Sequence, residues 1–142
     1  MTRGRRTSVR NLALAGVALV CGCAKTPVEP VAKIDGEAAY QANCLVCHQA
    51  DGRGVPFLQP SLVDGPWVLG DPQALAAFVL TGGFNSAERK DGPNENVMPA
   101  FTQLDDATLA AVLTYVRARF GKDAGAVTPE VVAQARATIA KG

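Results

Sequence analysis

The segment Cys44–His48, with the letters CLVCH, constrains this chain more than any other part of its sequence. It places two thiols three residues apart and an imidazole directly after the second. On one turn of helix the sulfurs of Cys44 and Cys47 can reach the two vinyl groups of a haem, and His48 then faces the iron from the same side. His48 is the only histidine in the chain. The segment therefore predicts one covalently attached haem c, around which the fold must be built.

The first 22 residues have the features of an export signal. They contain four arginines and no acidic residue, and residues 12–20 form an apolar run that is far too short to span a bilayer. The dipeptide Gly22-Cys23 resembles the end of a bacterial lipobox, so Cys23 is the expected lipidation site and mature N-terminus. Cys21 departs from the small or hydroxyl residue that is usual at its position. Cleavage near Cys23 without lipidation, and an uncleaved anchor, therefore stay open.

Charge and cysteine count exclude several functions. After residue 22 the chain carries 10 basic and 13 acidic residues, and a mildly acidic domain gives no reason to expect nucleic-acid binding. Of the four cysteines, two belong to the export region and two to the CLVCH segment. None is left for a structural disulfide, although the expected destination is oxidising.

Two other kinds of site use a Cys-x-x-Cys pair. A structural zinc ion needs four nitrogen or sulfur ligands, but after export the chain offers only Cys44, Cys47, His48 and a cysteine at its far end. A thioredoxin-like dithiol needs strands around it and a helix start at the first thiol. Here the motif lies at the end of a helical pattern with no strands nearby. The sequence favours haem over both.

Met98 is the expected second axial ligand. Bis-histidine ligation is impossible with one histidine, and Met1 lies in the predicted export signal. A lone methionine is often core filler, but Met98 follows a polar stretch and belongs to no helical stripe. Pro99 then stiffens the loop that must present the sulfur. Ligation by lysine or asparagine, or an open sixth position, stays open.

The helical patterns after residue 34 predict an all-α fold with about four helices. The expected helices cover residues 35–45, 72–80, 106–120 and 129–140, with Asp71 and Asp105 as caps of the middle two. Residues 49–70 and 83–97 are expected to be loops. No segment shows a convincing strand alternation.

Two of these helices have a predicted buried face. In the first, Ala38, Ala42 and Leu45 share one side, and small residues there would let another helix approach closely. The buried stripe of the long helix is expected to comprise Leu109, Val112, Leu113, Val116 and Phe120.

These features, in this order, resemble the class I cytochromes c. The shared segments are the CLVCH motif, residues 51–54 (DGRG), residues 60–62 (PSL), the Met98-Pro99 loop and the helix up to Phe120. We therefore expect a signal peptide (1–22), a tether (23–34), a cytochrome c domain (35–121) and a helical extension (122–142) packed on or near that domain. Residues 67–70 (WVLG), 113–117 (LTYVR) and 127–131 (VTPEV) are similar to cytochrome domains associated with periplasmic dehydrogenases and nitrite reductases.

The resemblance implies further roles for residues at matching positions. Pro60 would offer its carbonyl to the ring N–H of His48, which fixes the tautomer of the ligand. Gly36 and Tyr40 would pack the first helix across the long one. Trp67 would either line the haem or serve as a buried anchor, and both readings stay open.

Histidine–methionine ligation fills both axial positions of the iron and raises its reduction potential. It leaves no site for a small-molecule substrate, so the expected function is one-electron transfer between Fe(II) and Fe(III) and not enzymatic catalysis. The expected partners are redox proteins (a dehydrogenase, reductase or oxidase), and the expected place is the periplasm, with a membrane-anchored lipoprotein as the form. The alternatives are a dedicated cytochrome subunit of an oxidoreductase complex and a haem sensor or peroxidase in which Met98 dissociates.

Overall fold

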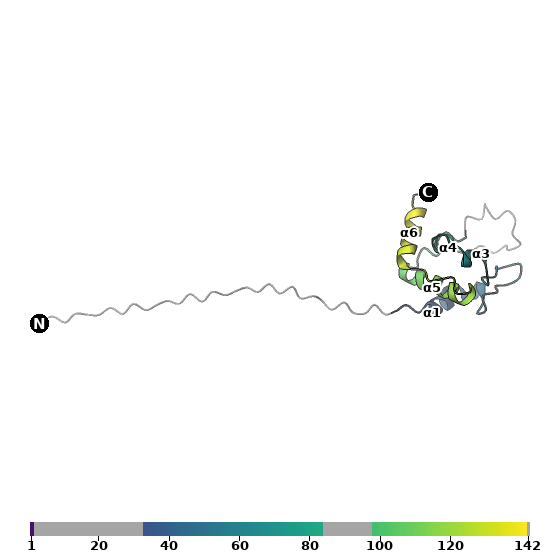
Figure 1. The fold of residues 1–142 in the computed structure, drawn as a ribbon, viewed down its shortest axis with the longest axis horizontal. Helices are drawn as coiled ribbons and strands as arrows, with labels where there is room; N and C mark the ends of the chain where they lie inside the picture. The colour runs from purple at the N-terminus through teal and green to yellow at the C-terminus, as the bar shows by residue number, and fades with distance from the viewer. Residues whose placement is uncertain (2–32, 84–97, 142) are drawn as a thin grey trace. The chain divides into compact units, whose positions relative to one another are not determined.

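The computed structural model describes Met1 and residues 33–83 and 98–141, and the residues from 33 onward form an all-α domain (Figure 1). The described helices are α1 (Gly36–Asn43), α2 (Leu45–His48), α3 (Pro66–Leu69), α4 (Pro72–Leu80), α5 (Asp106–Phe120) and α6 (Pro129–Ile139). In these ranges the only β-structure is an isolated antiparallel bridge between Val55 and Gln59. The predicted all-α class is confirmed, with two extra helices of four residues each, α2 and α3.

Several sequence predictions lie outside the described residues. They concern the signal peptide, Cys23, almost all of the tether and almost all of the loop 83–97. Within the described ranges, no helix has both the length and the apolar character that a bilayer crossing requires.

Aspartates cap three of the helices: Asp71 and Asp105, as predicted, and Asp35, which was predicted as the first residue of its helix. Asp35 accepts hydrogen bonds from the backbone N–H groups of Glu37 and Ala38, at 2.9 and 3.2 Å. Asp71 accepts from Ala74 at 2.8 Å, and Asp105 accepts from Thr108 at 2.7 Å. Each carboxylate thereby satisfies backbone donors that have no partner inside the helix.

Helix α5 is the central element, because its side chains enter two separate hydrophobic clusters. The α1–α3 cluster joins α5 to α1 and α3 and comprises Tyr40, Val68, Val112, Val116 and Phe120. The α4–α6 cluster joins α5 to α4 and α6 and comprises Leu75, Ala76, Val79, Leu80, Phe101, Leu109, Ala110, Leu113, Val127, Val132 and Ala135. All five residues of the predicted stripe on α5 are buried.

Helix α1 crosses α5 at very short range. A Cβ atom placed on Gly36 would lie 2.3 Å from the carbonyl oxygen of Ala111 and 3.1 Å from the Cβ of Tyr115. Gly36 and Tyr40 therefore form the face of α1 that meets α5, as predicted. The alanine stripe was wrong, since Ala38 and Ala42 are exposed. Alanine is the best helix former on any face, so its spacing did not identify the buried side.

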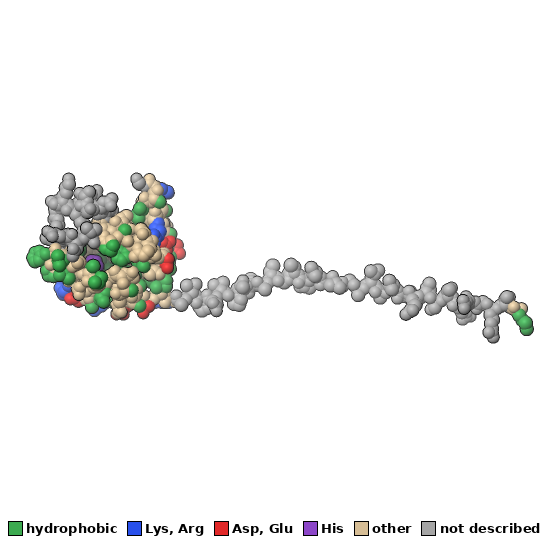
Figure 2. Space-filling model, turned by 180° about the vertical axis from the view of Figure 1, so that it is seen from behind, with side chains coloured by type: hydrophobic (Ala, Val, Ile, Leu, Met, Phe, Trp, Pro, Cys, Tyr) green, Lys and Arg blue, Asp and Glu red, His purple; other side chains and the backbone are tan. Residues whose placement is uncertain are grey.

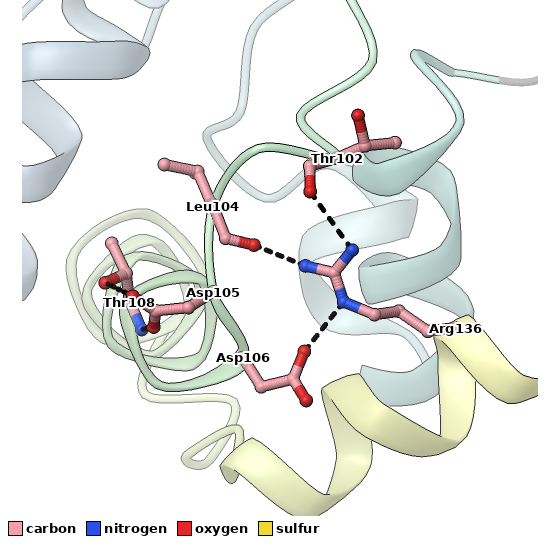
Figure 3. A network of polar contacts seen from close by, with 6 residues as sticks. All are labelled: Thr102, Leu104, Asp105, Asp106, Thr108 and Arg136. Atoms are coloured by element: carbon pink, nitrogen blue, oxygen red, sulfur yellow. Dashed lines mark hydrogen bonds and ion pairs between the residues drawn. The ribbon is translucent and has the colours of Figure 1, made fainter.

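Helix α6 is joined to the start of α5 by Arg136 (Figure 3). Its Nε lies 2.7 Å from Oδ1 of Asp106, and its other nitrogens donate to the backbone carbonyls of Thr102 and Leu104. The planar guanidinium thus binds a carboxylate and two carbonyl oxygens at once. These bonds connect α6 to the segment between Phe101 and α5.

A second arginine, Arg117 of α5, is buried, and among the described residues it bonds to backbone carbonyls alone. It donates to Val68 and Gly70 at 2.9 and 2.8 Å, to Gly125 at 2.9 Å, and to Ala124. The carbonyl groups replace the hydration water that the guanidinium loses when it is buried. Arg117 thereby attaches both α3 and the segment before α6 to the central helix.

Replacing Gly36 by alanine should lower the free energy of unfolding by about 1–3 kcal/mol, because the added methyl group overpacks the contact with α5. On a helix surface with no close neighbour the same change is stabilising. A decrease in the free energy of unfolding therefore identifies the close approach to α5. Chemical denaturation of the haem-loaded protein measures it. Ala38→Ser on the exposed face of α1 is the control and should stay within about 0.5 kcal/mol. A Gly36→Ala protein whose denaturation midpoint equals that of the wild type would contradict the close packing of α1 on α5.

Arg136→Lys should lower the free energy of unfolding by about 1–2 kcal/mol, because a lysine cannot reach the carboxylate and both carbonyls together. Arg53→Lys is the matched control. Arg53 pairs with Asp51 at 3.8 Å, and its side chain is 74% exposed, so its replacement should have almost no effect. Equal stability of the two variants would argue against the Arg136 contacts.

Candidate functional site

The CLVCH segment occupies the junction of α1 and α2. Cys44 ends α1 and begins α2, and its backbone N–H donates to the carbonyl of Tyr40 at 2.8 Å. Its own carbonyl accepts from the N–H groups of Cys47 and His48, at 3.2 and 2.9 Å. A single turn therefore carries both thiols and the imidazole, as the motif requires. Both cysteines are free and partly buried.

The surroundings of the thiols fit a haem-attachment site better than the two alternatives. Burial, followed by the neighbouring Cys47, raises the pKa of the Cys44 thiol to about 11. Redox-active dithiols have the opposite property, a thiol pKa lowered by positive surroundings. In the described part of the chain no three or more histidine, cysteine, aspartate or glutamate side chains gather as a metal site. Zinc is therefore not supported there.

His48 is buried and its ring orientation is set by Pro60. The side chain is 8% exposed, and Nδ1 lies 3.2 Å from the carbonyl oxygen of Pro60. Burial lowers the pKa of the imidazole, while the Pro60 carbonyl acts in the opposite direction. A neutral ring that donates from Nδ1 leaves Nε2 with a lone pair for a metal. The contact implied by the resemblance is present; its effect on a bound iron stays a prediction.

The loop after the motif brings Pro60 back to His48 through backbone hydrogen bonds. Gly54 donates to the His48 carbonyl at 3.1 Å, and Leu62 donates to Gly52 at 2.7 Å. Gly54 has a φ of 67°, and a Cβ there would lie 2.4 Å from the Gln59 carbonyl oxygen. The glycine therefore permits both the turn and the close return of the chain.

Met98 lies in a different hydrophobic cluster from the motif. It packs against the α4–α6 cluster, whereas Cys44 packs against the α1–α3 cluster. Two contacts hold its segment on the end of α4. Phe101 donates to the Val79 carbonyl at 3.2 Å, and a Cβ on Gly82 would lie 2.7 Å from the Met98 carbonyl oxygen. The structure thus assigns the two expected axial residues to the two clusters that α5 joins.

Trp67 lies on α3 and is 39% exposed, so it is not a buried anchor. Its ring is stacked on Phe78 with centroids 4.4 Å apart. Figure 2 shows the histidine reaching the surface of the domain close to hydrophobic side chains. Exposed large hydrophobic residues in the described ranges include Val46, within the motif, and Phe57 and Leu58, in the loop before Pro60.

Two features of the site could not be found from the sequence. The hydroxyl of Tyr40 donates to the carbonyl of Gln49 at 2.7 Å, and Gln49 has a φ of 62° and a ψ of 168°. Glycine is the residue expected in that conformation. A glutamine directly after the motif therefore gives no local signal of the turn that it makes.

A helical domain built around a Cys-x-x-Cys-His turn defines a c-type cytochrome domain. More particularly, the chain belongs to the family described as cytochrome c oxidase, cbb3-type, subunit III, which matches residues 32–116. Members of this family carry covalently bound haem c, and the thiol pair and buried imidazole of this chain fit that group. The chain is accordingly an electron-transfer protein and not itself an enzyme.

Three relatives illustrate the range of proteins in which this domain occurs. The chain is 37% identical over 112 residues to the fructose dehydrogenase cytochrome subunit of Gluconobacter japonicus, covering 72% of this chain and 22% of that protein. It is 32% identical over 121 residues to cytochrome c-552 of Thermus thermophilus, covering 82% and 73%. It is 30% identical over 95 residues to the cbb3-type oxidase subunit FixP of Azorhizobium caulinodans, covering 67% and 32%.

The chain spans only about a fifth of the length of the dehydrogenase cytochrome subunits that it matches. The similarity therefore concerns one cytochrome domain of those larger proteins. These relatives are named as cytochrome subunits of fructose and alcohol dehydrogenases and as a subunit of a cbb3-type cytochrome c oxidase. The predicted resemblance to cytochrome domains associated with dehydrogenases is confirmed for this one domain.

Proposed function

We propose that this chain is a periplasmic one-electron carrier with histidine–methionine ligation. Cys44 and Cys47 would hold the haem through thioether bonds, and His48 and Met98 would bind the iron. The observation that carries the proposal is the buried His48, which lies on the same turn as both thiols and contacts Pro60 at 3.2 Å. Two free thiols and a neutral imidazole on one turn match what covalent haem attachment requires.

The chain's own residues account for most of what such a carrier needs. The haem supplies the one-electron couple. Cys44 and Cys47 would supply the two thiols whose S–H groups add across the haem vinyl groups. Pro60 holds the His48 proton on Nδ1 and leaves Nε2 as the ligand atom. The Met98 thioether favours the reduced iron and so raises the potential.

The proposed partners are an electron-donating dehydrogenase and a respiratory acceptor. The matches to fructose and alcohol dehydrogenase cytochrome subunits, at 37% and 36% identity, support this class of donor. The match that covers 73% of cytochrome c-552 supports a carrier built on a single domain of this kind. The alternative is a dedicated cytochrome subunit of a complex, supported by the same dehydrogenase relatives and by FixP.

Membrane attachment forms the second part of the proposal. Cys23 would be lipidated, and residues 24–34 would act as the tether, since Pro27 and Pro30 disfavour regular structure there. An extended stretch of that length would let the domain move up to about 35 Å from the anchor. Such reach suits a carrier that meets two different partners.

Replacing Met98 tests the axial assignment. Met98→Ala should leave the haem covalently attached, open the sixth position and let the ferrous protein bind carbon monoxide rapidly. Met98→His is the matched control, since it refills the position with a nitrogen donor. Its spectrum should remain low-spin and its potential should fall. Optical titration under redox control measures both variants, and an unchanged spectrum in Met98→Ala would exclude Met98 as a ligand.

The wild-type protein tests the sensor or peroxidase alternative in the same assay. A carrier with both axial positions filled should bind carbon monoxide slowly. Rapid binding by the unmodified ferrous protein would favour the alternative in which Met98 dissociates.

The anchor is tested by Cys23→Ser. This change should release the domain into the soluble fraction with its haem content and spectrum unaltered, because the residue lies far from the motif in the sequence. Cys21→Ser is the control and should remain in the membrane fraction. A membrane-bound Cys23→Ser protein would argue against lipidation at this residue.

Purification in mild detergent distinguishes the free carrier from the subunit. A carrier should migrate alone on gel filtration, because redox partners of this kind bind through small, transient interfaces. Stoichiometric co-elution with a larger oxidoreductase would favour the subunit instead.

A further inference from the structure

Tyr40 forms hydrogen bonds with the first residue of the CLVCH segment and with the residue that directly follows it. Its backbone carbonyl accepts the N–H of Cys44 at 2.8 Å, and its hydroxyl donates to the carbonyl of Gln49 at 2.7 Å. The side chain is 1% exposed. Its ring is fixed against Tyr115 and Phe120, with centroids 5.3 and 5.6 Å away. One buried side chain therefore connects α1 to the residue that directly follows His48.

Gln49 has a backbone conformation that glycine normally supplies. Its φ of 62° and ψ of 168° are strained for a residue with a Cβ. Its N–H donates to Leu45 at 2.8 Å, and its carbonyl accepts from Gly52 at 3.3 Å as well as from Tyr40. Strained conformations persist only when their surroundings hold them. The Tyr40 hydroxyl is the side-chain group among these restraints. Burial raises the pKa of the phenol, so the proton needed for the bond stays in place.

The conformation of Gln49 directs the chain from His48 toward Pro60. The next residues turn so that Gly54 donates to the His48 carbonyl at 3.1 Å, and Pro60 then reaches the His48 ring at 3.2 Å. If Gln49 relaxed to an ordinary φ, the loop would leave α2 in another direction. The contact that orients the imidazole depends on that direction.

The geometry points to Tyr40 as a positioning residue of the haem site, whose hydroxyl holds the Gln49 carbonyl and thereby keeps the His48 ring on Pro60. This inference rests on the proposed function, in which His48 is the axial ligand. Tyr40 touches neither the ligand atom nor the iron in this role. It acts through the backbone on either side of the motif.

Tyr40→Phe in the haem-loaded protein tests the role, because it removes the hydroxyl and keeps the ring packing. NMR exchange of the His48 ring N–H with solvent should accelerate by about two- to tenfold, the range that corresponds to one lost hydrogen bond. The midpoint potential and the electron paramagnetic resonance g-values of the ferric haem should also shift. Tyr115→Phe is the matched control, since in the described residues its hydroxyl makes no hydrogen bond. It should leave all three readouts unchanged.

A second change separates positioning from general stability. Glycine adopts the conformation of Gln49 without strain, so Gln49→Gly combined with Tyr40→Phe should return the ring exchange and the potential toward the wild-type values. A merely structural Tyr40 would lower the unfolding temperature and leave exchange, potential and g-values unmoved, which would overturn the inference. A double variant that keeps the full shift would also overturn it, because Gln49 would then not transmit the effect.

The wild-type protein distinguishes failure of this inference from failure of the proposed function. If its ferric haem has no histidine ligand, the proposed function is wrong and the inference is wrong with it. If the ligand is present and Tyr40→Phe matches the wild type in every readout, only the inference is wrong.

Discussion

The close approach of α1 to α5 is the contact on which the rest of the structure depends. Because Gly36 has no Cβ, the backbone of α1 can approach the Ala111 carbonyl directly. One turn later the Tyr40 ring packs against Phe120. Because Cys44 both ends α1 and begins α2, this crossing also sets the position of the CLVCH turn. The site is therefore placed by helix packing, and its chemistry is carried by side chains on a short appended turn.

Helix α5 contributes buried side chains to both hydrophobic clusters of the domain. Its buried residues belong both to the cluster that Cys44 packs against and to the cluster that Met98 packs against. A haem held between His48 and Met98 would therefore have its two axial ligands supported by separate packed units. Arg117 and Arg136 strengthen this arrangement, since Arg117 attaches α3 to the central helix through backbone carbonyls and Arg136 attaches α6 to it through Asp106.

The helices that the sequence predicted well are those with local start signals. Asp71 with Pro72, Asp105, and Thr128 with Pro129 each mark a helix start within three residues, and α4, α5 and α6 begin where these residues indicate. The alanine stripe on α1 was mispredicted, because alanine spacing is the same on an exposed and a buried side, whereas Gly36 and Tyr40 form the face that the family resemblance implied. Helix α3 was missed because a helix of four residues is too short to show a periodic pattern. The position of the Trp67 ring was not predicted either, because it stacks on Phe78 of another helix.

The sequence by itself determined the chemistry of this protein: a thiol pair with one histidine, a single methionine after residue 34, and helix caps that make the fold all-α. These follow from residue identity and spacing, which are local properties. Only the tertiary structure decided that Pro60 lies against His48, that Met98 packs against the α4–α6 cluster, and that Tyr40 reaches Gln49. Those contacts join residues that are distant in the chain or force a backbone shape that the side chain does not favour, so no local pattern encodes them.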